Sequence, residues 1–228
     1  MVPVLDEAAV IGAALEALRP LRERGHEVIV SDGGSTDGTR ERAGGGADRV
    51  LAAPRGRARQ MNAGAEVAIG DVFVFLHADT KLPGEADRVV FDALGRRPGW
   101  GSFPVRLSGV HPAFRVIERM ISLRSRLSGI ATGDQAIFVA RDLFRAVGGF
   151  ADLALLEDVE LCRRLRRILP PVRPRAPVVT SSRRWEAGGI ARTTALMWWI
   201  RGAYALGVSP DRLARHYRFG GGPEGGPG

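Results

Sequence analysis

The chain has 228 residues and a formal net charge of +8. Its length favours one domain with a substantial hydrophobic core, and an apolar content of 45% is typical of a globular protein. Cys162 is the only cysteine, which excludes a disulfide within the chain and favours a reducing compartment such as the cytoplasm. No signal peptide is recognised, and the longest apolar stretch, residues 195–208, is interrupted by Arg201 and too short to span a bilayer.

Arginine supplies nearly all of the positive charge, since Lys81 is the only lysine. Guanidinium groups bind phosphates well, so nucleic acid is one class of partner that this composition allows. The arginines are scattered, however, and no basic tail is present. A basic, non-enzymatic nucleic-acid-binding module therefore remains an alternative, and it predicts an affinity that falls steeply with salt.

Helical and extended patterns alternate along the chain. Helices are expected over residues 7–24, 35–42, 57–68, 85–94, 112–127, 142–147, 157–168, 191–206 and 211–217. Strands are expected over residues 2–4, 26–31, 49–52, 72–77, 99–107, 136–140 and 177–180. The alternation predicts an α/β fold, with a mainly parallel central sheet and helices on both faces. Residues 219–228 are nearly all Gly and Pro and are expected to form a disordered tail.

The most informative segment is the apolar run 72–76, which leads directly into His77 and Asp79. Such a run predicts a strand buried on both faces, and ligand sites in open α/β sheets form beyond the carboxyl ends of such strands. A carboxylate at that place can hold a divalent metal ion. The alternative is that Asp79 only caps the next turn.

Two further segments predict contacts with a phosphorylated ligand. Residues 31–39 read SDGGSTDGT between a strand and a helix, where glycines allow close approach of a ligand and Asp32 can accept hydrogen bonds from a base or ribose. The alternative is a glycine-rich turn capped by Ser35; neither a Walker loop nor the Gly-x-Gly-x-x-Gly spacing is present. Residues 55–62 open a helix with Arg55, Arg59 and Gln60, which favours an anion, although a solvated basic face is the alternative.

Three short motifs in the second half carry weaker signals when each is taken alone. Residues 133–135 are Gly-Asp-Gln before an apolar strand, and Glu157, Asp158 and Glu160 begin a helix. Acidic residues in a first helical turn are also favoured by the helix dipole alone. Residues 183–185 are Arg-Arg-Trp, a group that could clamp a diphosphate or stack on a ring.

Taken in order, these motifs resemble those of glycosyltransferase family 2, whose members use nucleotide sugars and have the GT-A fold. The resemblance begins with residues 2–7 (VPVLDE), covers nearly the whole chain and rests on the ordered set. It implies that Asp79 binds Mn²⁺ or Mg²⁺ and that Asp158 is the general base, with Glu157 beside it. His77 stands where the family's motif has its first aspartate, and an imidazole there favours Mn²⁺.

The other candidate residues follow from the resemblance, except Arg55, Arg59 and Gln60, which follow from the basic start of the helix 57–68. The nucleotide-binding set is Pro3, Glu7, Asp32, Arg55, Arg59, Gln60 and His77. The acceptor side is Gly133, Asp134 and Gln135, and the contacts with the diphosphate or a ring are Arg183, Arg184 and Trp185. The glutamine pattern that precedes the Arg-Trp pair in membrane synthases is absent, which argues against a processive polymer synthase.

The sequence is therefore interpreted as one GT-A-like domain over residues 1–218, a metal-dependent inverting glycosyltransferase. The donor is expected to be UDP-linked rather than GDP-linked, and the acceptor is not identified. A nucleotidyltransferase is the nearest enzymatic alternative, but no lysine precedes Lys81 to form its usual start motif. The apolar helix 191–206 is expected to pack on the core or across a homodimer; the alternative is peripheral contact with the inner face of a membrane through Arg192 and Arg201.

Overall fold

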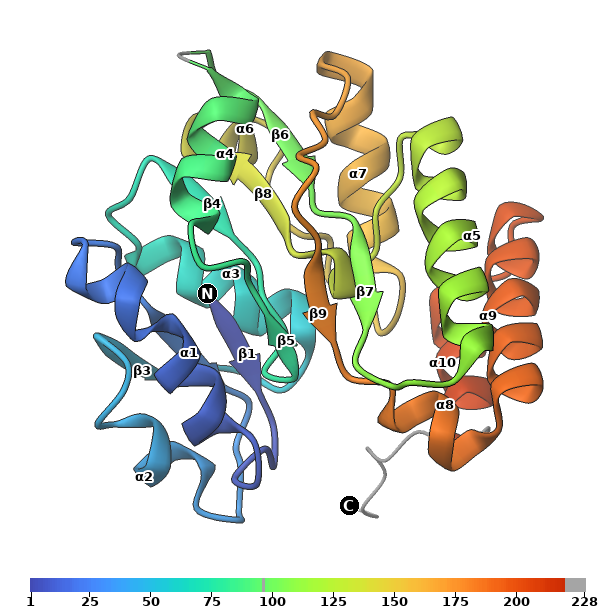
Figure 1. Ribbon diagram of the computed structural model, residues 1–228, viewed down its shortest axis with the longest axis horizontal. Helices are drawn as coiled ribbons and strands as arrows, with labels where there is room; N and C mark the ends of the chain where they lie inside the picture. The colour runs from blue at the N-terminus through green and yellow to red at the C-terminus, as the bar shows by residue number, and fades with distance from the viewer. Residues whose placement is uncertain (96, 220–228) are drawn as a thin grey trace.

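The computed structural model describes residues 1–95 and 97–219, and its strands form three sheets of three strands each (Figure 1). The first sheet is parallel and has the order β1 (Val2–Val4), β2 (Ile29–Asp32), β3 (Arg49–Ala52). Val4 lies opposite Asp32, so these two strands end side by side. The loops that follow β1 and β2 therefore leave the sheet at the same edge, where ligands bind in folds of this kind.

The other two sheets carry the rest of the site. In the second, β8 (Ile137–Ala140) lies antiparallel to both β4 (Val72–Val74) and β6 (Trp100–Ser102). In the third, β9 (Val178–Thr180) lies antiparallel to β5 (Thr80–Lys81) and parallel to β7 (Val105–Leu107). The first two sheets are joined where the Met1 amino group donates to the Val74 carbonyl at 2.8 Å and the Leu76 amide donates to the Met1 carbonyl at 3.0 Å.

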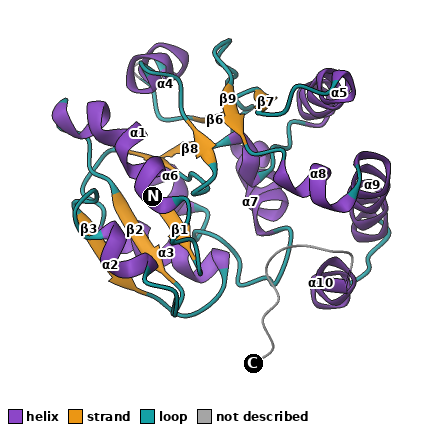
Figure 2. Ribbon diagram, turned by 60° about the horizontal axis from the view of Figure 1, so that its bottom comes forward, coloured by secondary structure: helices purple, strands orange, loops and turns teal. Residues whose placement is uncertain are grey.

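Helices surround these sheets, with α5, α9 and α10 on the side of the molecule away from α1 and α2 in both views (Figures 1 and 2). The helices of the described residues are α1 (Ile11–Glu23), α2 (Thr39–Ala43), α3 (Arg57–Val67), α4 (Ala86–Leu94), α5 (Pro112–Ser128), α6 (Arg141–Ala146), α7 (Glu157–Ile168), α8 (Arg183–Gly188), α9 (Ile190–Ala205) and α10 (Pro210–Phe219), with a short 3₁₀ turn at Gly133–Gln135. Within the described ranges, no helix is both long and apolar enough to cross a membrane.

The core forms mainly where apolar side chains of β4 and β8 meet α3, α6 and α7. Its centre is a group of edge-to-face and tilted aromatic rings: Phe73, Phe75, Phe144 and Phe150. The run 72–76 therefore behaves largely as its composition predicts, except that Val72 is 37% exposed at the start of β4. Burial of this run fixes the direction in which residues 77–79 leave the sheet.

The predicted α/β fold class and GT-A-like layout are confirmed. The parallel arrangement is found in β1-β2-β3, whereas β8 pairs antiparallel with its neighbours. The strand expected over 99–107 is two strands, because Pro104 interrupts it and has no N–H for a ladder. The elements β5 and α8 were not predicted. The disordered tail was expected over residues 219–228; Phe219 ends α10, and residues 220–228 lie outside the described residues.

Candidate functional site

The loops after β1 and β2 form one interlocked rim at the edge of the first sheet. Side chains of the second loop bond to backbone amides of the first: the Asp6 amide donates to Ser35 Oγ at 2.9 Å, Glu7 to Thr39 Oγ1 at 2.8 Å and Ala8 to an Asp37 oxygen at 2.9 Å. In return, the Thr36 amide donates to Asp6 Oδ1 at 2.8 Å. The SDGGSTDGT segment is thus a rigid turn fastened to the residues after β1, and Pro3 lies within the same edge, on β1.

Asp32 sits at the tip of β2 and holds this turn from within. It is 3% exposed, and its carboxylate accepts hydrogen bonds from the Ser35 hydroxyl and from the amides of Gly34 (3.3 Å) and Ser35 (3.2 Å). The capped glycine-rich turn that was kept as an alternative is therefore present. A contact between Asp32 and a base stays a prediction, and it would have to use lone pairs that the turn leaves over.

Of the anion-binding residues predicted around the start of α3, Gln60 is buried, whereas Arg55 and Arg59 are exposed. Gln60 is 3% exposed, and its Nε2 group donates to the carbonyls of Val4 (2.7 Å) and Ser31 (2.9 Å). These donors tie the ends of β1 and β2 together, and a nucleotide contact by Gln60 stays a prediction. Arg59 pairs with Asp152 at 2.8 Å on the surface, and Arg55 is exposed.

Asp79 lies just after the turn that ends the apolar run and faces α8. Arg183 Nη2 is 3.8 Å from Asp79 Oδ2, and both side chains are partly open to solvent. Burial raises the pKa of the Asp79 carboxyl; Arg183 acts in the opposite direction, and the negative charge of Asp134 adds to the rise. Asp79 is thus a partly buried carboxylate that is influenced by the negative charge of Asp134 and lies close to the Arg183 guanidinium.

His77 points to the other side of the same segment, over the 3₁₀ turn at Gly133–Gln135. A side chain at position 133 would meet His77 Nε2 at 2.5 Å, so the imidazole packs directly on Gly133. Burial, and next the charge of Arg57, lower the pKa of His77 to about 3, and the ring is neutral at ordinary pH. His77 lines a small hollow with Gly133, Glu157 and Asp158.

Asp158 is the carboxylate at the centre of this hollow. The Gly133 amide donates to its Oδ2 at 2.6 Å, and the Val159 amide donates to its Oδ1 at 2.6 Å. Burial raises its pKa, although the hydrogen bond from Gly133 and the charges of Arg201 and Arg57 act against the rise. Glu157 is buried beside it, with Arg57 Nη1 3.9 Å from its carboxylate. The geometry provides a half-buried carboxylate with raised proton affinity, next to a neutral imidazole.

The three residues at 183–185 point in three directions. Arg183 faces Asp79, as described. Arg184 lies 3.9 Å over the ring of Tyr217 on α10. Trp185 is 7% exposed and packs against Leu107, Phe114 and Ile117. The indole of Trp185 is part of the core between α5 and α8, and its contact with a ring or diphosphate stays a prediction.

Reasoning from the sequence missed three arginines that converge on Asp158 from separate helices. Arg57 begins α3, Arg124 lies on α5 and Arg201 lies on α9. The charges of Arg57 and Arg201 act to lower the pKa of Asp158, and the charge of Asp158 acts to raise the pKa of Arg124. The one available signal was for Arg57, which lies in the basic segment 55–62. Convergence of the other two depends on packing that a local pattern does not reveal.

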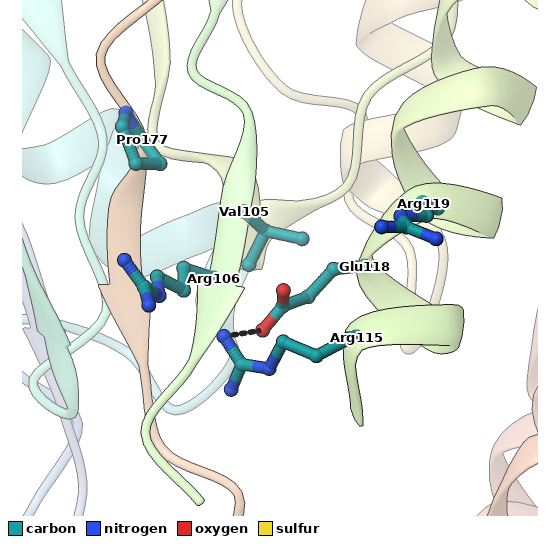
Figure 3. Close-up of a pocket in the computed structure, with 6 residues that line it drawn as sticks. All are labelled: Val105, Arg106, Arg115, Glu118, Arg119 and Pro177. Atoms are coloured by element: carbon teal, nitrogen blue, oxygen red, sulfur yellow. Dashed lines mark ion pairs between the residues drawn. The ribbon is translucent and has the colours of Figure 1, made fainter. Parts of the chain in front are cut away.

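A second hollow, of about 310 Å³, lies on the outer surface between β7 and α5 (Figure 3). It is lined by Val105, Arg106, Arg115, Glu118, Arg119 and Pro177. Arg115 and Glu118 pair there at 3.0 Å. None of the predicted site residues lines it, so the candidate site is the region that extends from Asp79 to Asp158.

Comparison with solved structures finds proteins of the same fold. A mannosyltransferase from Pyrobaculum calidifontis, solved with GDP-Man and Mn²⁺, aligns with 96% of this chain and 68% of its own, at 20% identity and a TM-score of 0.61. S. aureus TarS aligns over 84% of this chain and 63% of its own, at 16% identity and a TM-score of 0.62. Glucosyl-3-phosphoglycerate synthase from Mycobacterium tuberculosis, solved with Mn²⁺, UDP and glucosyl-3-phosphoglycerate, aligns over 79% of this chain and 68% of its own, at 22% identity and a TM-score of 0.57.

A search of curated proteins finds no match to this sequence. The family model for Glycosyl transferase family 2, in contrast, matches residues 1–144, more than half of the chain. The matched part contains the rim after β1 and β2, Asp79 and the Gly133–Gln135 turn, which together form most of the site described above. From the family match and the shared fold, the chain belongs to glycosyl transferase family 2 and is a glycosyltransferase.

Proposed function

We propose that this glycosyltransferase transfers a sugar from a UDP-linked donor to an acceptor hydroxyl, with inversion at the anomeric carbon. The observation that carries the proposal is Asp158, a half-buried carboxylate with raised pKa in a hollow beside His77. A general base needs a pKa closer to the working pH than that of a free carboxylate, and burial supplies the shift.

In the proposed reaction, the acceptor oxygen attacks the anomeric carbon from the face opposite the leaving group. A new carbon–oxygen bond to the acceptor forms while the bond from the anomeric carbon to the diphosphate breaks, and the diphosphate leaves with the bonding electron pair. The acceptor proton passes to Asp158. Each Asp158 oxygen accepts one backbone hydrogen bond and has a lone pair left for this proton.

Glu157 and His77 act as positioning groups in this scheme. Glu157 faces Arg57 at 3.9 Å and helps to fix the start of α7, on which Asp158 stands. The neutral His77 ring packs on Gly133, whose amide holds Asp158. His77 therefore shapes the hollow without bringing a charge that would lower the pKa of the base.

A divalent metal fits at Asp79 rather than at His77. Within residues 1–95 and 97–219 no cluster of three or more acidic, His or Cys side chains could enclose a metal ion by itself. Asp79 and the nearby Asp134, one of whose oxygens is buried with no hydrogen-bond partner, provide the hard oxygen donors that Mn²⁺ and Mg²⁺ accept. When bound, the ion would neutralise charge on the diphosphate; His77 points to Gly133 and Asp158 instead, which disfavours the earlier expectation that it tunes the metal.

The nucleoside side of the donor would lie against the rim after β1 and β2. Pro3, Glu7 and Asp32 border this rim, Arg55 and Arg59 stand at the start of α3, and Arg183 and Arg184 stand on α8. Arg183 already faces Asp79, so its guanidinium is well placed to meet a diphosphate held there. Gly133, Asp134 and Gln135 would form the floor on the acceptor side.

For the helix 191–206, both a homodimer contact and peripheral contact with the inner face of a membrane stay proposals.

The proposal is tested by Asp158→Asn, with release of UDP from UDP-sugars as the assay. General-base assistance is typically worth about 10²–10⁴-fold, so turnover should fall by roughly that factor while binding of UDP and Mn²⁺ stays within about twofold. Glu160→Gln is the matched control, because Glu160 is in the same helical turn but pairs with Arg164. Near-normal turnover of Asp158→Asn would remove the assignment and point to Glu157 or Asp134.

A further inference from the structure

Arg124 is a partly buried cation with too few partners for its donors. A guanidinium has five N–H donors. In the described residues, the Arg124 side chain makes only two long contacts, from Nη2 to Thr132 Oγ1 and to Gln135 Oε1, both at 3.5 Å, and its Nε is buried with no acceptor. Both acceptors are neutral, so among the described residues the partly buried Arg124 side chain has no direct carboxylate partner.

A second cation lies near enough for its charge to influence Arg124. Arg201 comes from α9, and its charge acts both on Arg124 and on Asp158. Burial and then the charge of Arg201 lower the pKa of Arg124 to about 10, while the charges of Asp134 and Asp158 act against this. Within the described ranges, no hydrogen bond or ion pair of the Arg201 side chain is found. Two neighbouring arginines of this kind repel each other unless an anion lies between them.

Arg124 contacts the turn that holds the proposed general base. Arg124 contacts the two residues that flank Gly133–Asp134, and the Gly133 amide holds Asp158. Arg183 and Asp79, the groups assigned to the diphosphate and metal, face each other at 3.8 Å. The contacts of Arg124 are instead with the turn that holds the proposed base.

We propose that Arg124 and Arg201 form an oxyanion-binding subsite beside Asp158, which holds a phosphate or carboxylate group of the acceptor. This deepens the proposed function, on which it rests, by assigning an anionic class of acceptor. The two guanidinium groups suit bidentate contacts to either oxyanion. Held there, the anion fixes the neighbouring hydroxyl of the acceptor within reach of Asp158 and relieves the repulsion between the arginines.

The test measures binding of inorganic phosphate and of acetate to the whole protein, without nucleotide or metal, by titration calorimetry and by thermal shift against chloride at equal ionic strength. The wild type should bind phosphate or acetate, and Arg124→Gln and Arg201→Gln should each weaken the tighter anion at least tenfold. Arg126→Gln is the matched control, since Arg126 is exposed on the same helix two residues away. Arg126→Gln should bind like the wild type, whereas Arg183→Gln reports any anion that binds at the proposed diphosphate position instead.

Glycerol 3-phosphate and glycerol extend the test to an alcohol with and without the anion. The phosphorylated alcohol should bind at least tenfold more tightly to the wild type, and Arg201→Gln should abolish the difference. Three results would each overturn the subsite. They are no binding by the wild type, binding by Arg124→Gln and Arg201→Gln as tight as by the wild type, and a loss confined to Arg183→Gln. Arg201 is partly exposed, so its variant tests the proposal even where Arg124→Gln fails to fold. UDP binding measured in parallel distinguishes failure of the subsite from failure of the proposed function.

Discussion

Asp158 is subject to two opposing influences on its pKa. Burial favours the neutral acid, whereas the amides of Gly133 and Val159 and the charges of Arg201 and Arg57 favour the carboxylate; burial outweighs them. A base must be deprotonated to work, so kcat/KM should decline as pH falls through this raised pKa, beginning above the usual value of about 3.9. A pH–rate profile of UDP release measures this. An acidic limb that persists unchanged in Asp158→Asn would belong to another group.

At Asp79, the expected effect is on metal rather than on proton transfer. Asp79→Asn should abolish the additional rise in Tm that Mn²⁺ gives in the presence of UDP, because a neutral amide is a poor ligand for a hard cation. Thermal shift with UDP, with and without Mn²⁺, measures the change. Asp71→Asn is a suitable control, since Asp71 is exposed and pairs with Arg141. Equally tight UDP binding in excess chelator would contradict a metal at Asp79.

The position of α3 against the first sheet depends on Gln60. Gln60→Leu removes the two hydrogen bonds that join the ends of β1 and β2, and leaves the buried Ser31 carbonyl with one donor fewer. The free energy of unfolding should fall by about 1–3 kcal/mol, as measured by urea titration. Arg59→Gln, one residue earlier and on the surface, should change it by less than about 1 kcal/mol. Equal losses in both variants would mean that the helix, not the buried amide, determines the effect.

Elements with clear periodicity could be predicted from the sequence, including α1, α5, α7 and the run that ends at His77. A two-residue strand such as β5 has no periodicity, and its existence depends on β9, about a hundred residues later. The same holds for the site. The sequence predicted which segments border it, but the directions of Gln60 and Trp185 depend on distant packing partners, and the convergence of Arg57, Arg124 and Arg201 depends on three helices meeting.

The whole molecule exposes large apolar side chains on α5 and α9, which lie on the same side in Figures 1 and 2. The exposed residues are Val116, Met120, Leu123 and Leu127 on α5, and Trp198 and Trp199 on α9. With a net charge of +8, we expect the protein to float with anionic vesicles at low salt and to be released at high salt. A Trp198→Ser, Trp199→Ser double variant should float less. A dimer in solution that does not float would identify the same surface as a contact between copies.

The order of strands in the third sheet also determines when the site can assemble. Because β9 lies between β5 and β7, neither outer strand has its partner until residues 178–180 have been synthesised. Asp79 immediately precedes β5 and Arg183 closely follows β9, so the same pairing brings these two groups together. Such contacts between distant segments form late and slowly compared with local ones. The nascent chain therefore cannot bring Asp79 and Arg183 together until β9 and the start of α8 have been synthesised.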